Sequence, residues 1–161
     1  MIVKDAADTL EACLQSVRPH VDELCIVDTG STDRSPEIAR RYADKWELFL
    51  EANNSDGLIE DFSRARNRSF DLITGDWAFW IDSDDVLVGG QHLRELCNAA
   101  TDDNVLYLLP YEYSHDEQGN CTCIHFRERL VRPPHRFAWR GPVHEVLLPI
   151  EPIQGSIQTI R

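Results

Sequence analysis

The sequence predicts an α/β fold with a doubly wound, Rossmann-like and mostly parallel sheet. Short apolar runs that indicate buried strands alternate with segments whose apolar residues recur every three or four positions, the spacing of a helix face. This alternation continues from residue 1 to residue 109 with short connections, as in a doubly wound sheet. After Pro110 the helical spacing does not return, so we expect a short antiparallel part at the C-terminal end.

Five strands are expected in the parallel sheet, each a short apolar run bounded by polar or turn residues. They lie at residues 1–3, 24–27, 46–50, 77–81 and 105–109. The first has the length of half a strand, since central strands normally run about five residues or more. The second ends at Asp28. The fourth, Trp77 to Ile81, is apolar throughout, as in a strand buried on both faces.

Four helices connect these strands. The first follows a cap at Asp8 or Thr9 and ends before Pro19. Its buried face carries Leu10, Cys13, Leu14 and Val17. Ser35 caps the second helix and Pro36 opens it, because proline suits the first helical position. The second, third and fourth helices are expected at about residues 35–43, 61–73 and 91–100.

Composition limits the possible functions. The 161 residues carry a formal net charge of -12, which argues against binding to nucleic acid and to anionic membrane surfaces. No apolar run approaches the roughly 18 residues of a membrane span, and no leader pattern opens the chain, so we expect a soluble protein that does not span a membrane. The odd number of five scattered cysteines fits reduced thiols and a cytoplasmic location.

A hairpin is expected beyond Pro110. Residues 111–114 and 122–126 can pair across a turn that contains Gly119 and Asn120. Cys121 and Cys123 in the second of these segments can form half of a zinc site, but no second pair of cysteines or histidines stands at a matching spacing. A plain hairpin is therefore the preferred interpretation.

Carboxylates follow the apolar run that ends at Ile81. In extended backbone Asp82 and Asp84 point the same way and converge, while Ser83 and Asp85 face elsewhere. Two converging carboxylates suit Mg²⁺ or Mn²⁺, and ligands of open α/β sheets bind at the carboxyl ends of the strands. The alternative is that these aspartates only solvate a turn before a helix, and the residues alone leave both interpretations open.

Three further groups are candidates for the same edge of the sheet. Asp28 can accept hydrogen bonds from a base or a ribose, or it can cap its own loop. Arg64 and Arg68 share one helix face and Arg66 points about 160° away, so the cluster is either a solvated basic face or a phosphate partner. His144 and Glu145 follow a turn; the histidine can bind a metal or a diphosphate and the glutamate can act as a base, or both lie on an edge strand.

Together these segments resemble glycosyltransferase family 2. The resemblance covers nearly the whole chain in order, and it is closest to the branch that includes bacterial peptide S-glycosyltransferases and repeat-containing glycosyltransferases. The segments that carry it are Met1 to Asp5, Ile26 to Arg34, Asp61 to Asn67, Gly75 to Trp77, Ile81 to Asp85, and Gly141 to Glu145.

The resemblance implies a GT-A fold and an inverting transfer of a sugar, of the hexosyltransferase type, from a nucleotide-diphosphate sugar. The donor is expected to be a UDP-sugar, the cofactor Mn²⁺ or Mg²⁺, and the acceptor a glycan, a lipid-linked glycan or a peptide. The implied catalytic residues are Asp84 and Glu145. The implied metal ligands are Asp82, Asp84 and His144. The implied nucleotide-sugar-binding residues are Asp28, Arg66, Asn67, Asp82 and Ser83, with Asp28 at the base.

The sequence also departs from the family pattern. Asp5 and Ala6 stand where the family has Asn-Glu, and Asp85 stands where Glu is commoner. We expect residues 1–161 to be one catalytic domain, either minimal or truncated at both ends. An unfinished first strand leaves a sheet edge that a second copy can cover, so a homo-oligomer is a further expectation.

Two alternatives belong to other functional classes. The first is a non-catalytic module of the same fold that binds a nucleotide-sugar or a glycan without turnover. The second is an aspartate-based phosphohydrolase or nucleotidyltransferase. Against the second, no Asp-x-Asp nucleophile motif follows the first strand, and no glycine-rich phosphate loop opens the chain.

Overall fold

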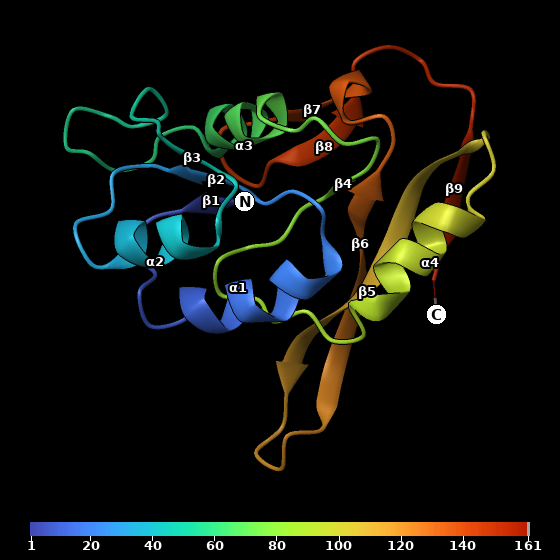
Figure 1. Cartoon of the computed structure of the whole chain (residues 1–161), viewed down its shortest axis with the longest axis horizontal. Coiled ribbons are helices and arrows are strands. Elements are labelled where there is room, and N and C mark those ends of the chain that lie inside the picture. Colours follow the sequence, from blue (N-terminus) through green and yellow to red (C-terminus); the bar gives the residue numbers. More distant parts are fainter. Residues whose placement is uncertain (161) are drawn as a thin grey trace.

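The computed structural model describes residues 1–160 and has an α/β architecture (Figure 1). Its N-terminal half contains a parallel sheet of three strands in the order β1-β2-β3. These strands are β1 (Ile2–Val3), β2 (Cys25–Asp28) and β3 (Lys45–Leu48). The central strand β2 is buried along its whole length, so its polar last residue, Asp28, is held inside the protein.

Helices cover both faces of this sheet (Figure 1). The helices α1 (Leu10–Val17) and α2 (Ser35–Tyr42) lie on one face, and α3 (Phe62–Asp71) lies on the other. The side chains of β2 alternate between the faces, because successive residues of a strand point to opposite sides. Ile26 packs in the cluster with α1 and α2, and Val27 packs against Ala65 of α3.

The second half of the chain forms a separate sheet in the order β4-β6-β5-β9. Its central pair, β5 and β6, is a long antiparallel hairpin whose closed end projects away from the β1-β2-β3 sheet (Figure 1). The elements of this half are β4 (Ala78–Phe79), α4 (Gln91–Ala99), β5 (Asn104–His115), β6 (Cys121–Val131), β7 (Phe137–Arg140), β8 (Val146–Pro149) and β9 (Ser156–Thr159). Two short 3-10 helices, Arg18–His20 and Pro134–Arg136, complete the chain.

The α/β fold class predicted from the sequence is confirmed. The predicted buried face of the first helix is confirmed residue by residue, and the hairpin beyond Pro110 also forms. No helix within residues 1–160 has both the length and the apolar character needed to cross a membrane.

The antiparallel part is larger than expected. Strand β5 does not end before Pro110 but continues to His115, because Pro110 pairs with Phe126 inside the hairpin. The apolar run from Trp77 to Ile81 forms only two residues of strand, and these pair antiparallel with β6. Apolar runs alone do not distinguish a parallel partner from an antiparallel one, which explains the difference.

Candidate functional site

Asp28 ends the central strand with a carboxylate that is only half satisfied. Its side chain is 0% exposed. The oxygen Oδ1 accepts hydrogen bonds from the backbone N–H groups of Gly30 and Ser31, at 2.8 and 2.7 Å. The oxygen Oδ2 is buried and has no hydrogen-bond partner among residues 1–160. A buried acceptor without a donor is costly, so this oxygen marks a position where a ligand N–H or O–H group would be stabilising.

Asn53, in the segment between β3 and α3, places a second unpartnered acceptor beside the loop after β2. Its Nδ2 donates to the carbonyl of Thr29 at 2.7 Å, while its Oδ1 is buried without a partner in the described part of the chain. Lys4 holds the loop from the other side, because its Nζ donates to the carbonyls of Thr29 and Gly30 at 3.2 and 2.9 Å. Sequence reasoning missed Asn53, since residues 51–60 show no periodicity that would single it out.

Gly30 allows this loop to close tightly. Its φ of 96° lies in the left-handed region, which glycine adopts without strain. An added Cβ would also lie 3.0 Å from a side-chain methyl of Leu50 and 3.5 Å from Asn53 Nδ2. The loop after β2 is therefore packed against the segment that carries Asn53.

The carboxylates after β4 lie in a turn and not in a strand. Strand β4 ends at Phe79, and the N–H of Asp85 donates to the carbonyl of Asp82 at 3.2 Å. The alternation of strand side chains therefore does not extend to Asp82 and Asp84, contrary to expectation. Asp84 is exposed, whereas Asp82, Ser83 and Asp85 are half-buried.

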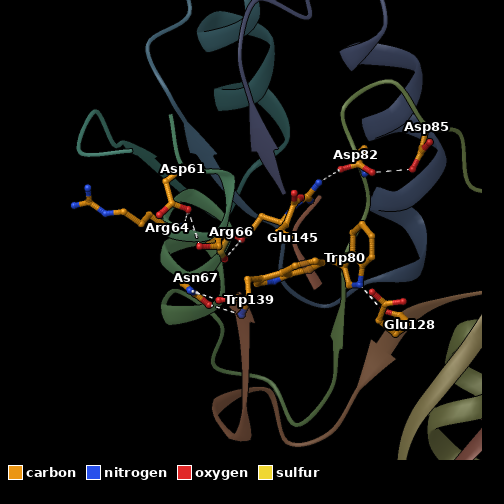
Figure 2. Close-up of polar contacts among 12 residues, drawn as sticks. Asp61, Arg64, Arg66, Asn67, Trp80, Asp82, Asp85, Glu128, Trp139 and Glu145 are labelled. Atoms are coloured by element: carbon orange, nitrogen blue, oxygen red, sulfur yellow. Dashed lines mark hydrogen bonds and ion pairs between the residues drawn. The ribbon is translucent and has the colours of Figure 1, made fainter. Parts of the chain in front are cut away.

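Arg66 joins two of the predicted site residues (Figure 2). Its Nη2 lies 2.7 Å from Asp82 Oδ1, and its Nε lies 2.5 Å from Glu145 Oε1. Burial opposes the charge of this guanidinium, but the two carboxylates outweigh it and raise the pKa of Arg66 above its ordinary value. The arginine is therefore a fixed cation between the end of β4 and the start of β8.

Arg129 is a second buried cation in this cluster, and sequence reasoning missed it. Its Nη2 lies 3.0 Å from Asp85 Oδ2, and its Nη1 lies 3.7 Å from Asp82 Oδ2. The guanidinium also stacks 3.9 Å from the ring centroid of Trp80. Arg129 lies on β6, and its position beside the aspartates depends on the antiparallel pairing of β6 with β4, which the sequence did not predict.

Tyr111 completes the partners of Asp85. Its hydroxyl donates to Asp85 Oδ1 at 3.0 Å. Burial, followed by the charge of Asp85, raises the pKa of Tyr111 to about 12, so the hydroxyl keeps its proton at neutral pH. Both carboxylate oxygens of Asp85 are therefore occupied by protein donors.

The remaining predicted residues are dispersed around this cluster. Asn67 exchanges hydrogen bonds with the backbone of Trp139 (Figure 2). His144 is exposed and has a φ of 56°. Arg64 pairs with Glu51 and Arg68 pairs with Glu47 of β3, so Arg66 is the arginine of α3 that faces the cluster.

The residues after β4 offer oxygen ligands for a divalent ion. Hard cations such as Mg²⁺ and Mn²⁺ prefer carboxylates, and the exposed carboxylate of Asp84 is accessible to one. Asp82 already faces Arg66 and Arg129. An ion bound to Asp82 would therefore share the negative charge of this carboxylate with two guanidinium groups. The grouping of Asp82, Asp84 and His144 around one ion stays a prediction.

A family model and several relatives indicate one family. A family model described as "Glycosyl transferase family 2" matches residues 1–144. A TPR repeat-containing protein of Synechococcus elongatus is 44% identical over 88 residues, which are 55% of this chain and 20% of that protein. The glycosyltransferase YibD of Escherichia coli is 30% identical over 62% of this chain and 29% of its own length. The prophage-derived glycosyltransferase SunS of Bacillus subtilis is 29% identical over 53% of this chain and 19% of its length. The chain thus spans about a fifth to three tenths of the length of these relatives.

Solved structures show the same fold at lower identity. Glucosyl-3-phosphoglycerate synthase of Mycobacterium tuberculosis, in complex with UDP, superposes with a TM-score of 0.59 and 19% identity over 83% of this chain and 55% of that chain. TarS of Staphylococcus aureus, also in complex with UDP, gives a TM-score of 0.53 and 18% identity over 67% of this chain and 33% of that chain. These structures are GT-A glycosyltransferases, so the predicted GT-A fold is confirmed. Since the family model covers most of the sequence, the chain belongs to glycosyltransferase family 2.

Proposed function

We propose that this chain binds a UDP-sugar at the carboxyl ends of β2 and β4 and transfers the sugar, a hexose, to an acceptor with inversion at the anomeric carbon. Membership of the family supports the transfer of a sugar from a nucleotide donor. Two neighbours of the same fold, at 18% and 19% identity, were solved with UDP, and a third structure was solved with Mn²⁺ and UDP-glucose. The acceptor is proposed to be a glycan, a lipid-linked glycan or a peptide.

The observation that carries this proposal is the unpartnered Oδ2 of Asp28. The base of UDP has an N–H group between two carbonyls, and a buried carboxylate oxygen is a strong acceptor for such a donor. The other oxygen of Asp28 is already fixed by Gly30 and Ser31, so the carboxylate is oriented before a ligand arrives. Asn53, which contacts this loop through Thr29, supplies a second acceptor for the base or the ribose.

Arg66 is the cation that we assign to the diphosphate. Departure of a nucleoside diphosphate leaves negative charge on phosphate oxygens, and a protein with a net charge of -12 needs a local cation to stabilise it. Arg66 stays protonated and is held by Asp82 and Glu145. A bound Mn²⁺ or Mg²⁺ held by Asp82, Asp84 and His144 would add Lewis-acid stabilisation of the same oxygens.

Glu145 is proposed as the group that takes the proton of the acceptor. Inversion requires attack on the anomeric carbon from the face opposite the diphosphate, and a carboxylate is a suitable general base. Oε1 of Glu145 accepts the hydrogen bond from Arg66, which leaves Oε2 for the acceptor hydroxyl. Arg66 therefore orients the proposed base as well as the diphosphate.

Calorimetry of UDP binding, with and without Mn²⁺, tests the site. Asp28→Asn keeps an oxygen for Gly30 and Ser31 but replaces Oδ2 by an N–H₂ donor, so we expect UDP affinity to fall by about tenfold or more. Asp84→Asn should remove the effect of Mn²⁺. The control is Asp22→Asn, because Asp22 is exposed and pairs with Arg94. This variant should change neither the UDP affinity nor the effect of Mn²⁺.

Equal UDP affinity in the wild type and in Asp28→Asn would refute the proposed base pocket. Incubation with a panel of nucleotide-sugars then tests turnover. Release of UDP supports a transferase, whereas tight UDP binding with no UDP release from any donor would support the non-catalytic nucleotide-sugar-binding module.

A further inference from the structure

The closed end of the β5–β6 hairpin brings together three metal-binding side chains that have no part in the proposed donor site. One ligand atom from each of Glu112, His115 and Cys121 lies within 4.8 Å of the other two. Glu112 and His115 are exposed, and Cys121 is half-buried. We propose that these three residues bind one Zn²⁺ ion, with water as its fourth ligand.

A distortion of the hairpin creates this grouping. Glu112 and His115 are three residues apart, so regular alternation would place them on opposite faces of the strand. The pairing register shifts between Glu112 and Ser114, and again between Ser114 and His115. Such a bulge redirects side chains, and here it brings Glu112 Oε2 to 2.9 Å from His115 Nε2. The hairpin therefore presents the two side chains on one side.

The third ligand comes from the opposite strand at a fixed position. Cys121 is the register partner of His115, and residues 116–120 connect them. The carboxylate of Asp116 accepts hydrogen bonds from the N–H groups of Gln118 and Asn120, at 3.0 and 2.8 Å, and the N–H of Asp116 donates to the carbonyl of Asn120. These bonds fix the turn, so the thiol and the imidazole are positioned before an ion binds.

The ligand chemistry favours zinc over the hard cations of the donor site. A thiolate, an imidazole and a carboxylate are common zinc ligands, and Mg²⁺ binds neither sulfur nor imidazole well. Around tetrahedral Zn²⁺ the ligand atoms lie about 3.5 Å apart, so a movement of roughly 1 Å would close the site. In that movement the ion replaces the direct contact between Glu112 and His115.

A second thiol lies near and needs to be distinguished. Cys123 Sγ lies 3.5 Å from His125 Nε2 and contacts that imidazole rather than the first cluster. Cys121→Ser and Cys123→Ser are therefore a matched pair of variants, two residues apart on the same strand. Cys97→Ser, in α4, is a control for a thiol outside the hairpin.

The test is titration of Co²⁺ into the reduced full chain, followed by its displacement with Zn²⁺. We expect a thiolate-to-cobalt charge-transfer band that saturates at one Co²⁺ per chain and that a carboxylate site such as Asp84 cannot give. Cys121→Ser should abolish the band, and His115→Ala and Glu112→Gln should weaken binding by about tenfold or more. The variants Cys123→Ser and Cys97→Ser should retain the charge-transfer band.

Three results would overturn the assignment. They are the absence of a charge-transfer band in the wild type, a band that persists in Cys121→Ser, or a band that is lost in Cys123→Ser or Cys97→Ser. Circular dichroism of each variant shows that it is folded, which the exposure of Glu112 and His115 favours. This test does not depend on UDP binding. The zinc site can therefore be refuted while the proposed function holds, and the proposed function can be refuted while the zinc site holds.

Discussion

Asn67 and Trp139 lie 72 residues apart in the chain and exchange two hydrogen bonds. Asn67 Nδ2 donates to the carbonyl of Trp139 at 3.0 Å, and the N–H of Trp139 donates to Asn67 Oδ1 at 2.8 Å. The pair connects α3 to β7, and the indole of Trp139 packs edge-on against Phe70 and Trp80 beside it. Asn67 therefore fixes the strand that leads into the turn before Glu145.

Replacement of Asn67 by alanine should destabilise the protein. The substitution leaves the backbone N–H and carbonyl of a buried residue without partners, which costs about 1–3 kcal/mol of unfolding free energy. Urea unfolding followed by tryptophan fluorescence measures the change. Asn98→Ala, at an exposed position of α4, is the matched control and should change stability little. Equal stability of the Asn67→Ala variant and the wild type would show that water replaces both bonds.

Replacement of Arg129 by an uncharged residue should lower the free energy of unfolding. The residue is 5% exposed and its guanidinium faces Asp82 and Asp85, so Arg129→Met leaves the two carboxylates without this cation. Removal of one partner of a buried ion pair typically costs about 3–5 kcal/mol. Arg129→Lys retains the positive charge, so its unfolding free energy should fall less than that of Arg129→Met. Urea unfolding of both variants tests this order, and a methionine variant as stable as the wild type would contradict it.

The parts of the fold that follow from local spacing could be predicted from the sequence. The face of α1 follows from apolar residues three and four positions apart, and the separation of Arg66 from Arg64 and Arg68 follows from their angles around the helix. Asp28 was identified because a polar residue that ends a buried strand lies at the ligand-binding edge of a sheet. These inferences needed no knowledge of distant partners.

The parts that depend on pairing between distant strands could not be predicted. Arg129 reaches the aspartates because β6 pairs with β4, and a short apolar run carries no information about its partner. Strand β4 ends early and a turn begins at Asp82, so Asp82 and Asp84 do not alternate as residues of a strand, contrary to the prediction. The cluster of Glu112, His115 and Cys121 depends on a bulge, which the spacing of these residues does not reveal.

Stability should fall at alkaline pH partly because of Cys25. Burial, followed by the charge of Glu23, raises the pKa of the Cys25 thiol from 9.0 to about 11. Between these values the unfolded chain loses the proton while the folded chain keeps it. The unfolding free energy therefore has its full value below about pH 9 and decreases by up to about 1.4 kcal/mol per pH unit as the pH rises toward 11.

The comparison of the wild type with Cys25→Ala isolates this contribution from the other thiols and tyrosines. Urea unfolding at several pH values from 8 to 11 should show a steeper loss for the wild type, so that the two curves approach each other as the pH rises. The cavity left by alanine lowers stability by an amount that does not depend on pH. Parallel curves would show that the Cys25 thiol ionises equally in the folded and unfolded states.

Glu145→Gln should separate the two roles proposed for this residue, as a support for Arg66 and as a base. The glutamine oxygen can still accept the hydrogen bond from Arg66 Nε, so Arg66 stays in place and the Kd for UDP should change little. The amide cannot take a proton, so sugar transfer should slow by about 10²–10⁴-fold. Calorimetry of UDP and measurement of UDP release, with a donor that the wild type turns over, test the two effects together.

Glu128→Gln, on β6, is a carboxylate control whose side chain is outside this ion-pair cluster. A large loss of UDP affinity with no further loss of turnover at saturating donor would show that Glu145 acts only by positioning Arg66.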